Sequence, residues 1–410
     1  MSNRLARYRA LNDRLRLTSP ISALEKGLYV KRPGLSAADE IVGHMEPSPT
    51  SAIALVGGIG SGKSTELLLA EKRLSEVEDT RAFYIDVSEL HDLDKLEHGV
   101  LVAAVGLKLC ELLEETLTPR PPRDVSHSIA QFRSWAATDI DLDTNEDSNP
   151  PDEFVLTPGK LSMPQKVAPD VQYAFHGLFT KLLQSLPSPH PYLIVLLDSL
   201  DRISNMEAFG ALIEADLRLL QKAGIGVVLT APLLSLYGQY RPLLDRFDHI
   251  VAVRPLDVET DPQAVEFLAQ VLAARDPEGL LTPPIRRLLA ESSGGVLRDM
   301  LVLCTDAARS AYMAGADHID EAHVRAAAFQ LGRTRWLGLS HRDIDILRRL
   351  AKPPLISRSL VEPGRLGPSL YAPSTDDELA LLMTRRILEY AQDGQPPRFV
   401  VHPVLRPLLQ

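Results

Sequence analysis

The feature that most constrains this 410-residue chain is the stretch Ala54–Leu68, ALVGGIGSGKSTELL. A short apolar run enters a cluster of four glycines and leaves through Lys63, Ser64 and Thr65 into a segment that looks helical. Glycines allow the backbone to approach a ligand closely, whereas so flexible a loop packs poorly in a core. The stretch therefore predicts a strand, a loop that binds a negatively charged group, and a helix.

The spacing of Gly57, Gly62, Lys63 and Ser64 matches the pattern G-x-x-x-x-G-K-[ST]. In such a loop backbone N–H groups surround phosphate oxygens, the lysine reaches the β- and γ-phosphates, and the hydroxyl binds Mg²⁺. The alternative is a glycine turn beside an unrelated lysine. The pattern predicts an ATP/ADP and Mg²⁺ site made by Gly58, Ile59, Gly60, Ser61, Gly62, Lys63, Ser64 and Thr65.

A second motif supplies acidic groups. The stretch YLIVLLDSLDR is an apolar strand that ends in Asp198, with Asp201 three residues later. Open α/β sheets build their sites at the carboxyl ends of their strands. Asp198 is therefore predicted to hold Mg²⁺ together with Ser64, and the alternative role is a helix N-cap.

Five short apolar runs predict strands, at 52–56, 81–87, 192–197, 225–230 and 249–253. Near-continuous apolar runs that alternate with helical stretches are typical of a parallel sheet covered on both faces. The predicted fold is a doubly wound α/β domain over residues 33–255. Residues 117–170 are rich in proline and contain the acidic tract Asp139–Glu153, which predicts an insertion.

Helical patterns replace the strands after residue 255. Asp261–Pro262 begins the first helix, and residues 256–332 are expected to form a helical lid. Residues 333–410 begin with a capping-box pattern at Ser340–Asp343 and contain a second at Thr375–Glu378. Their helices are followed by an apolar strand near the end, an order that suits a winged helix.

Charge and cysteine content limit the function classes. Residues 1–32, a predicted basic arm, carry a net charge of +6, and residues 333–410 carry +4, around an acidic centre. These basic ends are either solvated surface or a contact for a polyanion such as nucleic acid. The two cysteines suit reduced core positions. No secretory signal or membrane span is expected, so a cytoplasmic location without membrane association is predicted.

The combination of phosphate loop, acidic motif, lid and winged helix resembles AAA+ and STAND-type ATPases. In NACHT-like STAND members the acidic motif is an apolar strand, Asp, a small residue, an apolar residue and Asp, which LIVLLDSLDR matches. Replication-initiator AAA+ proteins usually carry Glu where this chain has Ser199. The resemblance covers about residues 28–410. The departure at Ser199 implies slow hydrolysis, unless Asp201 orients the attacking water.

The resemblance implies further site residues. Arg32 matches an arginine near the nucleotide base, and Thr230 occupies the sensor-1 strand, without the arginine that often follows in STAND proteins. Arg246 matches an arginine finger that acts on a neighbour's nucleotide, with a salt bridge to Asp245 or Asp248 as the alternative. Arg298 matches the sensor-2 arginine of the lid, where STAND lids usually have a proline.

The terminal segment FVVHPVLRPLL resembles the winged-helix segment in which a STAND histidine contacts the ADP phosphate. His402 is the matching residue, although Pro403 replaces the usual Asp. The alternative is a structural histidine.

Three functions remain open at this point. The first is a nucleotide-driven switch ATPase that self-associates and works with a separate effector or sensor protein, in prokaryotic defence or signalling. The second is a DNA-associated AAA+ ATPase, which the sparse Lys/Arg content of 355–371 disfavours. The third is a nucleotide-bound scaffold without turnover.

Overall fold

The computed structural model describes residues 2–16, 24, 26–117, 120–136, 169–187, 191–351, 373–392 and 395–410. The chain divides into two compact units. We call residues 37–56 and 66–252 the sheet unit. Residues 1–36, 57–65 and 253–410 form the other unit, which we call the lid unit because it contains the predicted helical lid.

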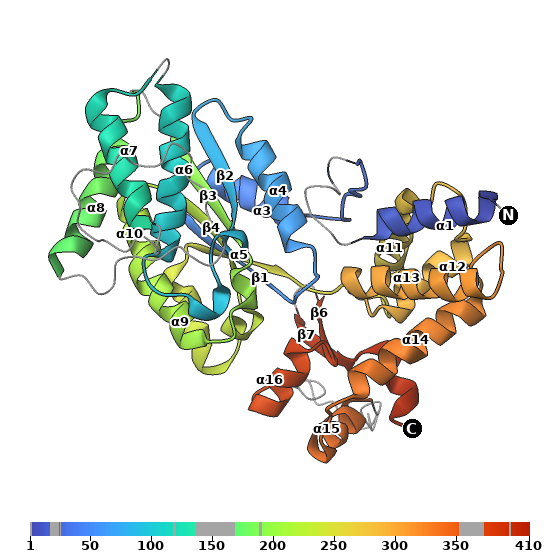
Figure 1. Cartoon of the computed structure of the whole chain (residues 1–410). Coiled ribbons are helices and arrows are strands. Elements are labelled where there is room, and N and C mark those ends of the chain that lie inside the picture. Colours follow the sequence, from blue (N-terminus) through green and yellow to red (C-terminus); the bar gives the residue numbers. More distant parts are fainter. Residues whose placement is uncertain are drawn as a thin grey trace. The chain divides into compact units, whose positions relative to one another are not determined.

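Five strands form the sheet, in the order β2-β3-β4-β1-β5 (Figure 1). The pairs β1–β4, β2–β3 and β3–β4 are parallel, and β1 and β4 are buried along their whole length. All five strand predictions are confirmed to within a residue or two at each end. The bounds are β1 Ala52–Gly57, β2 Thr80–Asp86, β3 Tyr192–Asp198, β4 Gly226–Ala231 and β5 His249–Val253.

The strand order creates a switch point beside β1. The chain leaves β1 toward β2 at one edge of the sheet, whereas it leaves β4 toward β5 at the other edge. Ligands in open α/β sheets bind in the crevice where neighbouring strands lead off in opposite directions. The carboxyl ends of β1 and β4 are therefore the place where this sheet favours a ligand.

The sheet unit contains the helices α3 Ala37–Met45, α4 Lys63–Leu74 (whose first turn belongs to the lid unit), α5 Val87–Leu90, α6 Val100–Thr116, α7 Arg123–Ala136, α8 Pro169–Gln184, α9 Met206–Leu212 and α10 Arg218–Lys222. Helices α6, α7 and α8 pack together. A Cβ on Gly106 would lie 2.0 Å from Cζ of Phe132, so α6 and α7 can approach only at a glycine. The predicted insertion thus contains a packed helix, α7, while the tract Asp139–Glu153 lies outside the described residues.

A buried carboxylate fixes the start of α6. Asp216 lies in a π-helical turn, Ile213–Leu217, and is 2% exposed. Its two oxygens accept hydrogen bonds from the N–H groups of Gly99 and Leu101, the latter at 2.9 Å. Burial raises the pKa of Asp216 to about 7, although these backbone hydrogen bonds act in the opposite direction. A side chain more than a hundred residues away thus serves as the cap of this helix.

The lid unit contains α1 Ser2–Leu15, α11 Pro262–Arg275, α12 Pro283–Ser292, α13 Leu297–Met313 and α14 Glu321–Trp336 (Figure 1). Helix α1 packs on α11 and α13. Arg4 donates to the carbonyl of Tyr312 at 3.0 Å, at the end of α13, and Arg7 donates to the carbonyl of Glu278 at 3.2 Å. Part of the basic character of the N-terminal segment therefore serves backbone carbonyl groups, of which that of Tyr312 lies at a helix C-terminus, where cations are favoured.

The winged-helix part of the lid unit comprises α15 His341–Ala351, α16 Asp376–Met383, the antiparallel hairpin of β6 Ile387–Gln392 and β7 Gln395–Val401, and a terminal turn, Pro403–Leu408. The capping box at Thr375 is confirmed, and Ser340 and Asp343 bond each other reciprocally. The segment 355–371, on which the DNA prediction depended, lies outside the described residues.

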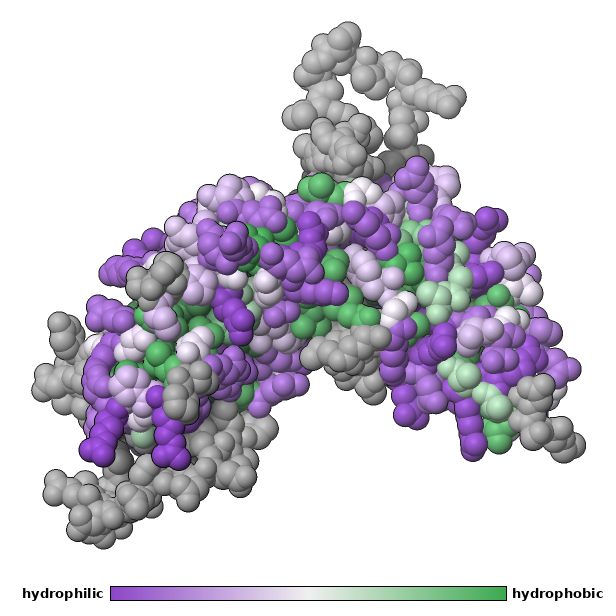
Figure 2. Space-filling view, turned by 90° about the horizontal axis from the view of Figure 1, so that it is seen from above, coloured by the Kyte–Doolittle hydropathy of each residue, from purple (hydrophilic) through white to green (hydrophobic). Residues whose placement is uncertain are grey.

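Figure 2 shows mainly hydrophilic residues, with hydrophobic ones in scattered groups. Cys110 and Cys304 are buried free thiols, and burial raises the pKa of the Cys110 thiol to about 12, so both are unreactive core positions as predicted. Among the described residues, no helix combines the length and apolar character that a membrane span requires.

The Asp216 cap generates a stability prediction. The Asp216→Asn variant places an amide NH₂ against backbone N–H donors, so we expect a loss of about 1–3 kcal/mol in the free energy of unfolding. Urea titration followed by circular dichroism measures it. The control is Asp245→Asn, an exposed member of an ion pair with Arg241, which should change stability by less than about 0.5 kcal/mol. Equal stabilities of the two variants would contradict the capping role.

Candidate nucleotide site

The glycine loop lies between β1 and α4 and belongs to the lid unit. Gly60 and Gly62 have φ values of +85° and +100°, which side-chain-bearing residues adopt at a cost. A Cβ on Gly57 would lie 2.5 Å from the carbonyl oxygen of Val253. Residues with side chains would therefore strain the backbone at Gly60 and Gly62 and clash at Gly57.

Lys63 is held inside the loop. Lys63 is 4% exposed, and its Nζ donates to the carbonyls of Gly57 at 2.7 Å and Gly58 at 3.0 Å. An ammonium so deeply buried needs negative partners, and carbonyl dipoles supply part of them. The arrangement places a cation where the motif expects phosphate. Ser61 adds a buried Oγ with no hydrogen-bond partner among the described residues.

The first turn of α13 lies directly on the loop. The N–H of Arg298 donates to the carbonyl of Gly60 at 3.2 Å, and a Cβ on Gly60 would lie 2.5 Å from Cβ of Arg298. The structure thus places Arg298, the predicted sensor-2 residue, beside the glycine loop. A second arginine, Arg385 from the turn before β6, donates to the carbonyl of Ile59 at 3.1 Å.

Asp198 ends β3 and is 2% exposed. Its Oδ2 accepts a hydrogen bond from the Tyr84 hydroxyl at 2.7 Å, and its Oδ1 accepts one from the N–H of Ser199 at 2.7 Å. Burial raises the pKa of Tyr84, and the charge of Asp198 raises it further, so the hydroxyl remains a donor. Ser199 has a left-handed φ of +71°, a strained conformation of the kind that clusters at functional sites.

The carboxyl ends of β2 and β3 bring further polar groups together. Asp86 pairs in register with Asp198 and accepts from the N–H of Ser88 at 3.0 Å, which starts α5. The Ser88 hydroxyl also lies 3.3 Å from that of Ser199. Asp201, 8% exposed, lies in the short turn Leu200–Arg202 that follows. The acidic motif therefore forms one polar edge of the sheet unit.

Thr230 lies near the carboxyl end of β4, paired with Leu55 of β1. It is fully buried, and its Oγ1 has no hydrogen-bond partner among the described residues. A buried hydroxyl without a partner is costly. It is the kind of group whose missing hydrogen bond a ligand oxygen or a water supplies.

Arg246 and Arg32 have partners within their own units. Arg246 is about half exposed and pairs with Glu214 at 2.5 Å. Asp245 instead pairs with Arg241, and Asp248 accepts from the N–H of Ala52. Arg32 donates to the carbonyl of Arg254 at 3.0 Å.

His402 is fully buried, and its Nε2 lies 3.3 Å from Oδ2 of Asp299. Its Nδ1 accepts from the N–H of Val404 at 3.3 Å, which assigns the proton to Nε2. Burial lowers the pKa of His402 to about 4, so the ring is neutral at pH 7. His402 therefore contacts the carboxylate of Asp299 and the backbone of Val404, as a structural histidine does.

Asp299, which the sequence did not single out, collects three partners. Besides His402, Arg335 of α14 pairs with Oδ2, and Arg385 lies 3.1 Å from Oδ1. Burial would raise the pKa of Asp299, but the contact with His402 and the charges of Arg335 and Arg385 lower it overall. The carboxylate is ionised and joins α13, α14 and the winged-helix part.

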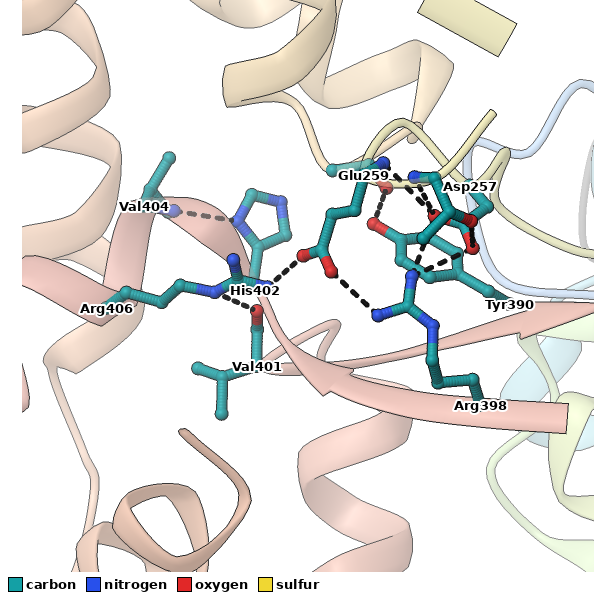
Figure 3. A network of polar contacts seen from close by, with 10 residues as sticks. Asp257, Glu259, Tyr390, Arg398, Val401, His402, Val404 and Arg406 are labelled. Atoms are coloured by element: carbon teal, nitrogen blue, oxygen red, sulfur yellow. Dashed lines mark hydrogen bonds and ion pairs between the residues drawn. The ribbon is translucent and has the colours of Figure 1, made fainter. Parts of the chain in front are cut away.

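A separate ion-pair cluster holds the β6–β7 hairpin (Figure 3). Arg398 of β7 contacts both oxygens of Asp257, at 2.7 and 2.8 Å, and Glu259 at 2.7 Å. Arg406 also contacts Glu259, and the guanidinium of Arg398 lies 5.0 Å from the ring centroid of Tyr390. These contacts fasten the hairpin to the segment before α11.

A Mg²⁺ ion at this site would need the nucleotide. In the described part of the chain, no group of three or more His, Cys, Asp or Glu side chains could hold a metal ion by itself. Mg²⁺ in phosphate sites is commonly bound by one or two side chains together with phosphate oxygens and water. Ser64 and Asp198, the ligands that the sequence predicts, belong to the lid unit and the sheet unit respectively.

Sequence reasoning missed Tyr84, Asp299, Arg335 and Arg385. Tyr84 lies in a strand that was read only as apolar, although its position two residues before Asp86 puts both side chains on one face. Asp299 follows Arg298 directly and carried no separate pattern. The partners of both residues come from distant segments, so only the folded chain reveals them.

No protein-family model matches the chain, and no curated protein matches it. Among solved structures, the ORC2 protein of Aeropyrum pernix in ADPNP and ADP complexes is 16% identical over 93% of each chain, with a TM-score of 0.46. The ORC1 protein of Aeropyrum pernix in complex with DNA is 15% identical over 81% of this chain and 72% of that chain, with a TM-score of 0.44. Domain III of the Thermotoga maritima replication initiation protein DnaA is 15% identical over 74% of this chain and 94% of that chain, with a TM-score of 0.38. These values assign no family or function to the chain.

His402 generates a pH prediction. Its folded pKa of about 4 lies below the ordinary 6.5, so between these values the unfolded chain binds a proton that the folded chain does not. The contribution of neutral His402 to the free energy of unfolding is therefore complete above pH 6.5. It falls as the pH falls toward 4, by up to about 1.4 kcal/mol per pH unit. Thermal unfolding of wild type and His402→Gln across this range measures the slope. The His402→Gln profile should be flatter, whereas the profile of the control, exposed His341→Gln, should match wild type. Parallel profiles of His402→Gln and wild type would contradict this assignment.

Proposed function

We propose that the chain is a P-loop ATPase of the AAA+/STAND class that binds ATP with Mg²⁺ at residues 58–65 and hydrolyses it slowly. The observation that carries the proposal is the glycine loop with Lys63 buried inside it, next to the first turn of α13. The loop follows β1 at the switch point of the sheet. The buried hydroxyls of Ser61 in the lid unit and Thr230 in the sheet unit lack a hydrogen-bond partner among the described residues, and each suits a ligand oxygen.

Each residue has a role that follows from its chemistry. Backbone N–H groups of the loop bind phosphate oxygens, and Lys63 offsets the charge of the β- and γ-phosphates. Ser64 and Asp198 hold Mg²⁺, which neutralises charge that develops on the phosphates. Asp201 lies in the turn after Asp198, and turnover faster than we propose would indicate that it orients the attacking water. Thr230 and Arg298 would contact the γ-phosphate, and Arg32 would lie near the base.

Both oxygens of Asp198 accept hydrogen bonds, one from the Tyr84 hydroxyl and one from the Ser199 N–H. Each oxygen keeps a lone pair for a metal-bound water. Ser199 offers no carboxylate at the position where initiator proteins usually have Glu, which supports slow turnover.

The switch hypothesis and the DNA hypothesis draw on different features. Of the solved structures named above, one is of a replication initiation protein and one is in complex with DNA, so they agree with the DNA-associated alternative more than with a STAND switch. Similarity at that level carries no function over to this chain. Within the described residues, the first turn of α16 holds Asp376, Asp377 and Glu378, which would repel a phosphate backbone.

A switch requires two states of the lid unit. The ion pairs of Asp299 and of Arg398 hold the winged-helix part on the lid, and nucleotide exchange would shift the balance between this state and an open one. In this proposal the open state self-associates or engages a separate effector or sensor protein. His402 acts through Asp299 in holding the closed state.

ATP binding is the first test. Lys63→Ala should abolish detectable ATP binding in titration calorimetry without loss of the fold, because the ammonium serves phosphate charge. Asp198→Asn is the matched variant: it should keep ATP bound while Mg²⁺-dependent turnover falls by about 10²–10³-fold. Wild-type affinity in Lys63→Ala would refute the phosphate site, and wild-type turnover in Asp198→Asn would refute the acidic motif.

Self-association is tested through Arg246. If Arg246 completes a neighbour's site, ATPase activity per subunit should rise with protein concentration, and Arg246→Ala should remove that rise while ATP still binds. A mixture of Arg246→Ala and Lys63→Ala proteins should recover some activity. The control is Arg241→Ala, which removes a comparable surface ion pair with Asp245. Activity that is flat with concentration, together with an inactive mixture, would favour a monomeric switch.

A further inference from the structure

Arg385 combines an unusual backbone with an unusual set of contacts. It lies between α16 and β6 with a φ of +58°, one of two left-handed residues other than glycine among those described. Its Nη1 donates to the carbonyl of Ile59 and lies 3.1 Å from Asp299, while its own carbonyl accepts from Arg335 at 2.7 Å. A strained backbone of this kind persists only where its surroundings determine it strongly.

The contact with Ile59 orients a peptide group of the glycine loop. In a trans peptide the C=O of one residue and the N–H of the next share a plane and point in opposite directions. A donor on the carbonyl of Ile59 therefore directs the N–H of Gly60 to the other side. The N–H of Arg298 holds the next carbonyl, that of Gly60, in the same way.

This orientation matters because the loop is rich in glycine. Glycine loses more conformational freedom on ordering than any other residue, so a free glycine loop binds phosphate at an entropic cost. A group that orders the loop before the ligand arrives lowers this cost. Arg385 and the first turn of α13 are placed to do so from the carbonyl side.

We propose that Arg385 is a positioning residue for phosphate binding, through which docking of the winged-helix part raises the nucleotide affinity of the loop. The inference rests on the proposed function, because it assumes that the loop binds a nucleotide. Arg385 thus links the winged-helix part to the nucleotide site, whereas the resemblance implies that His402 makes this link by contacting the ADP phosphate. His402 instead helps to hold Asp299, which aims the guanidinium of Arg385.

The coupling between docking of the winged-helix part and nucleotide binding works in both directions. If docking raises nucleotide affinity by a given factor, nucleotide binding raises the docking equilibrium by the same factor. Asp299 is the anchor of this coupling, because it holds Arg385 of the winged-helix part against the lid. Bound nucleotide should therefore slow the opening of the β6–β7 hairpin.

Two variants separate positioning from docking alone. Arg385→Gly removes the guanidinium and suits the positive φ, so the backbone is not strained further. Arg398→Ala removes the ion pairs to Asp257 and Glu259, which fasten the same hairpin without contacting the loop (Figure 3). ADP and ATP affinities are measured by titration calorimetry, and docking by hydrogen exchange of the hairpin amides.

We expect Arg385→Gly to weaken ADP binding about tenfold, the effect of one lost charge-assisted hydrogen bond, and to abolish the slowing of hairpin exchange by ADP. Arg398→Ala should speed hairpin exchange yet weaken ADP binding less than about threefold. Wild-type affinity in Arg385→Gly, or equal weakening in both variants, would overturn the inference while wild-type binding upholds the proposed function. Absence of nucleotide binding in wild type would overturn both.

Discussion

The buried charge of Asp299 is the constraint on which the lid unit depends. A carboxylate that is 2% exposed is costly unless it is paired, and its partners come from three different places: Arg335 of α14, Arg385 before β6 and His402 after β7. Removing any one of them leaves charge or polar surface without compensation. This one ionised group therefore links the helical lid to the winged-helix part, alongside the ion pairs of Arg398.

The same group connects packing with the candidate chemistry. Arg385 reaches from Asp299 to the carbonyl of Ile59, and the residue before Asp299 donates its N–H to the carbonyl of Gly60. The glycine loop is thus ordered from its carbonyl side by the lid unit. A loop that must expose its N–H groups to phosphate gains from such an arrangement, because its carbonyl groups are already satisfied.

Local physics explains what could be predicted. Apolar runs located the five strands, and Asp261, Ser340 and Thr375 form the helix caps that their patterns indicate. Arg246 shows the limit of such reasoning: a surface ion pair was an open alternative, but its partner is Glu214 rather than a neighbour in the chain. Which carboxylate an arginine meets depends on the packing of distant segments.

The sequence by itself determined the five strands, the glycine loop and the acidic strand end, because each rests on residues close together in the chain. The tertiary structure decided which groups tune them. Tyr84 reaches Asp198 only because β2 pairs with β3, and Asp216 caps α6 across more than a hundred residues. Asp299 acquires its three cationic or polar partners in the same way. Buried polar groups must find partners wherever the fold brings them, and spacing in the sequence carries no record of those meetings.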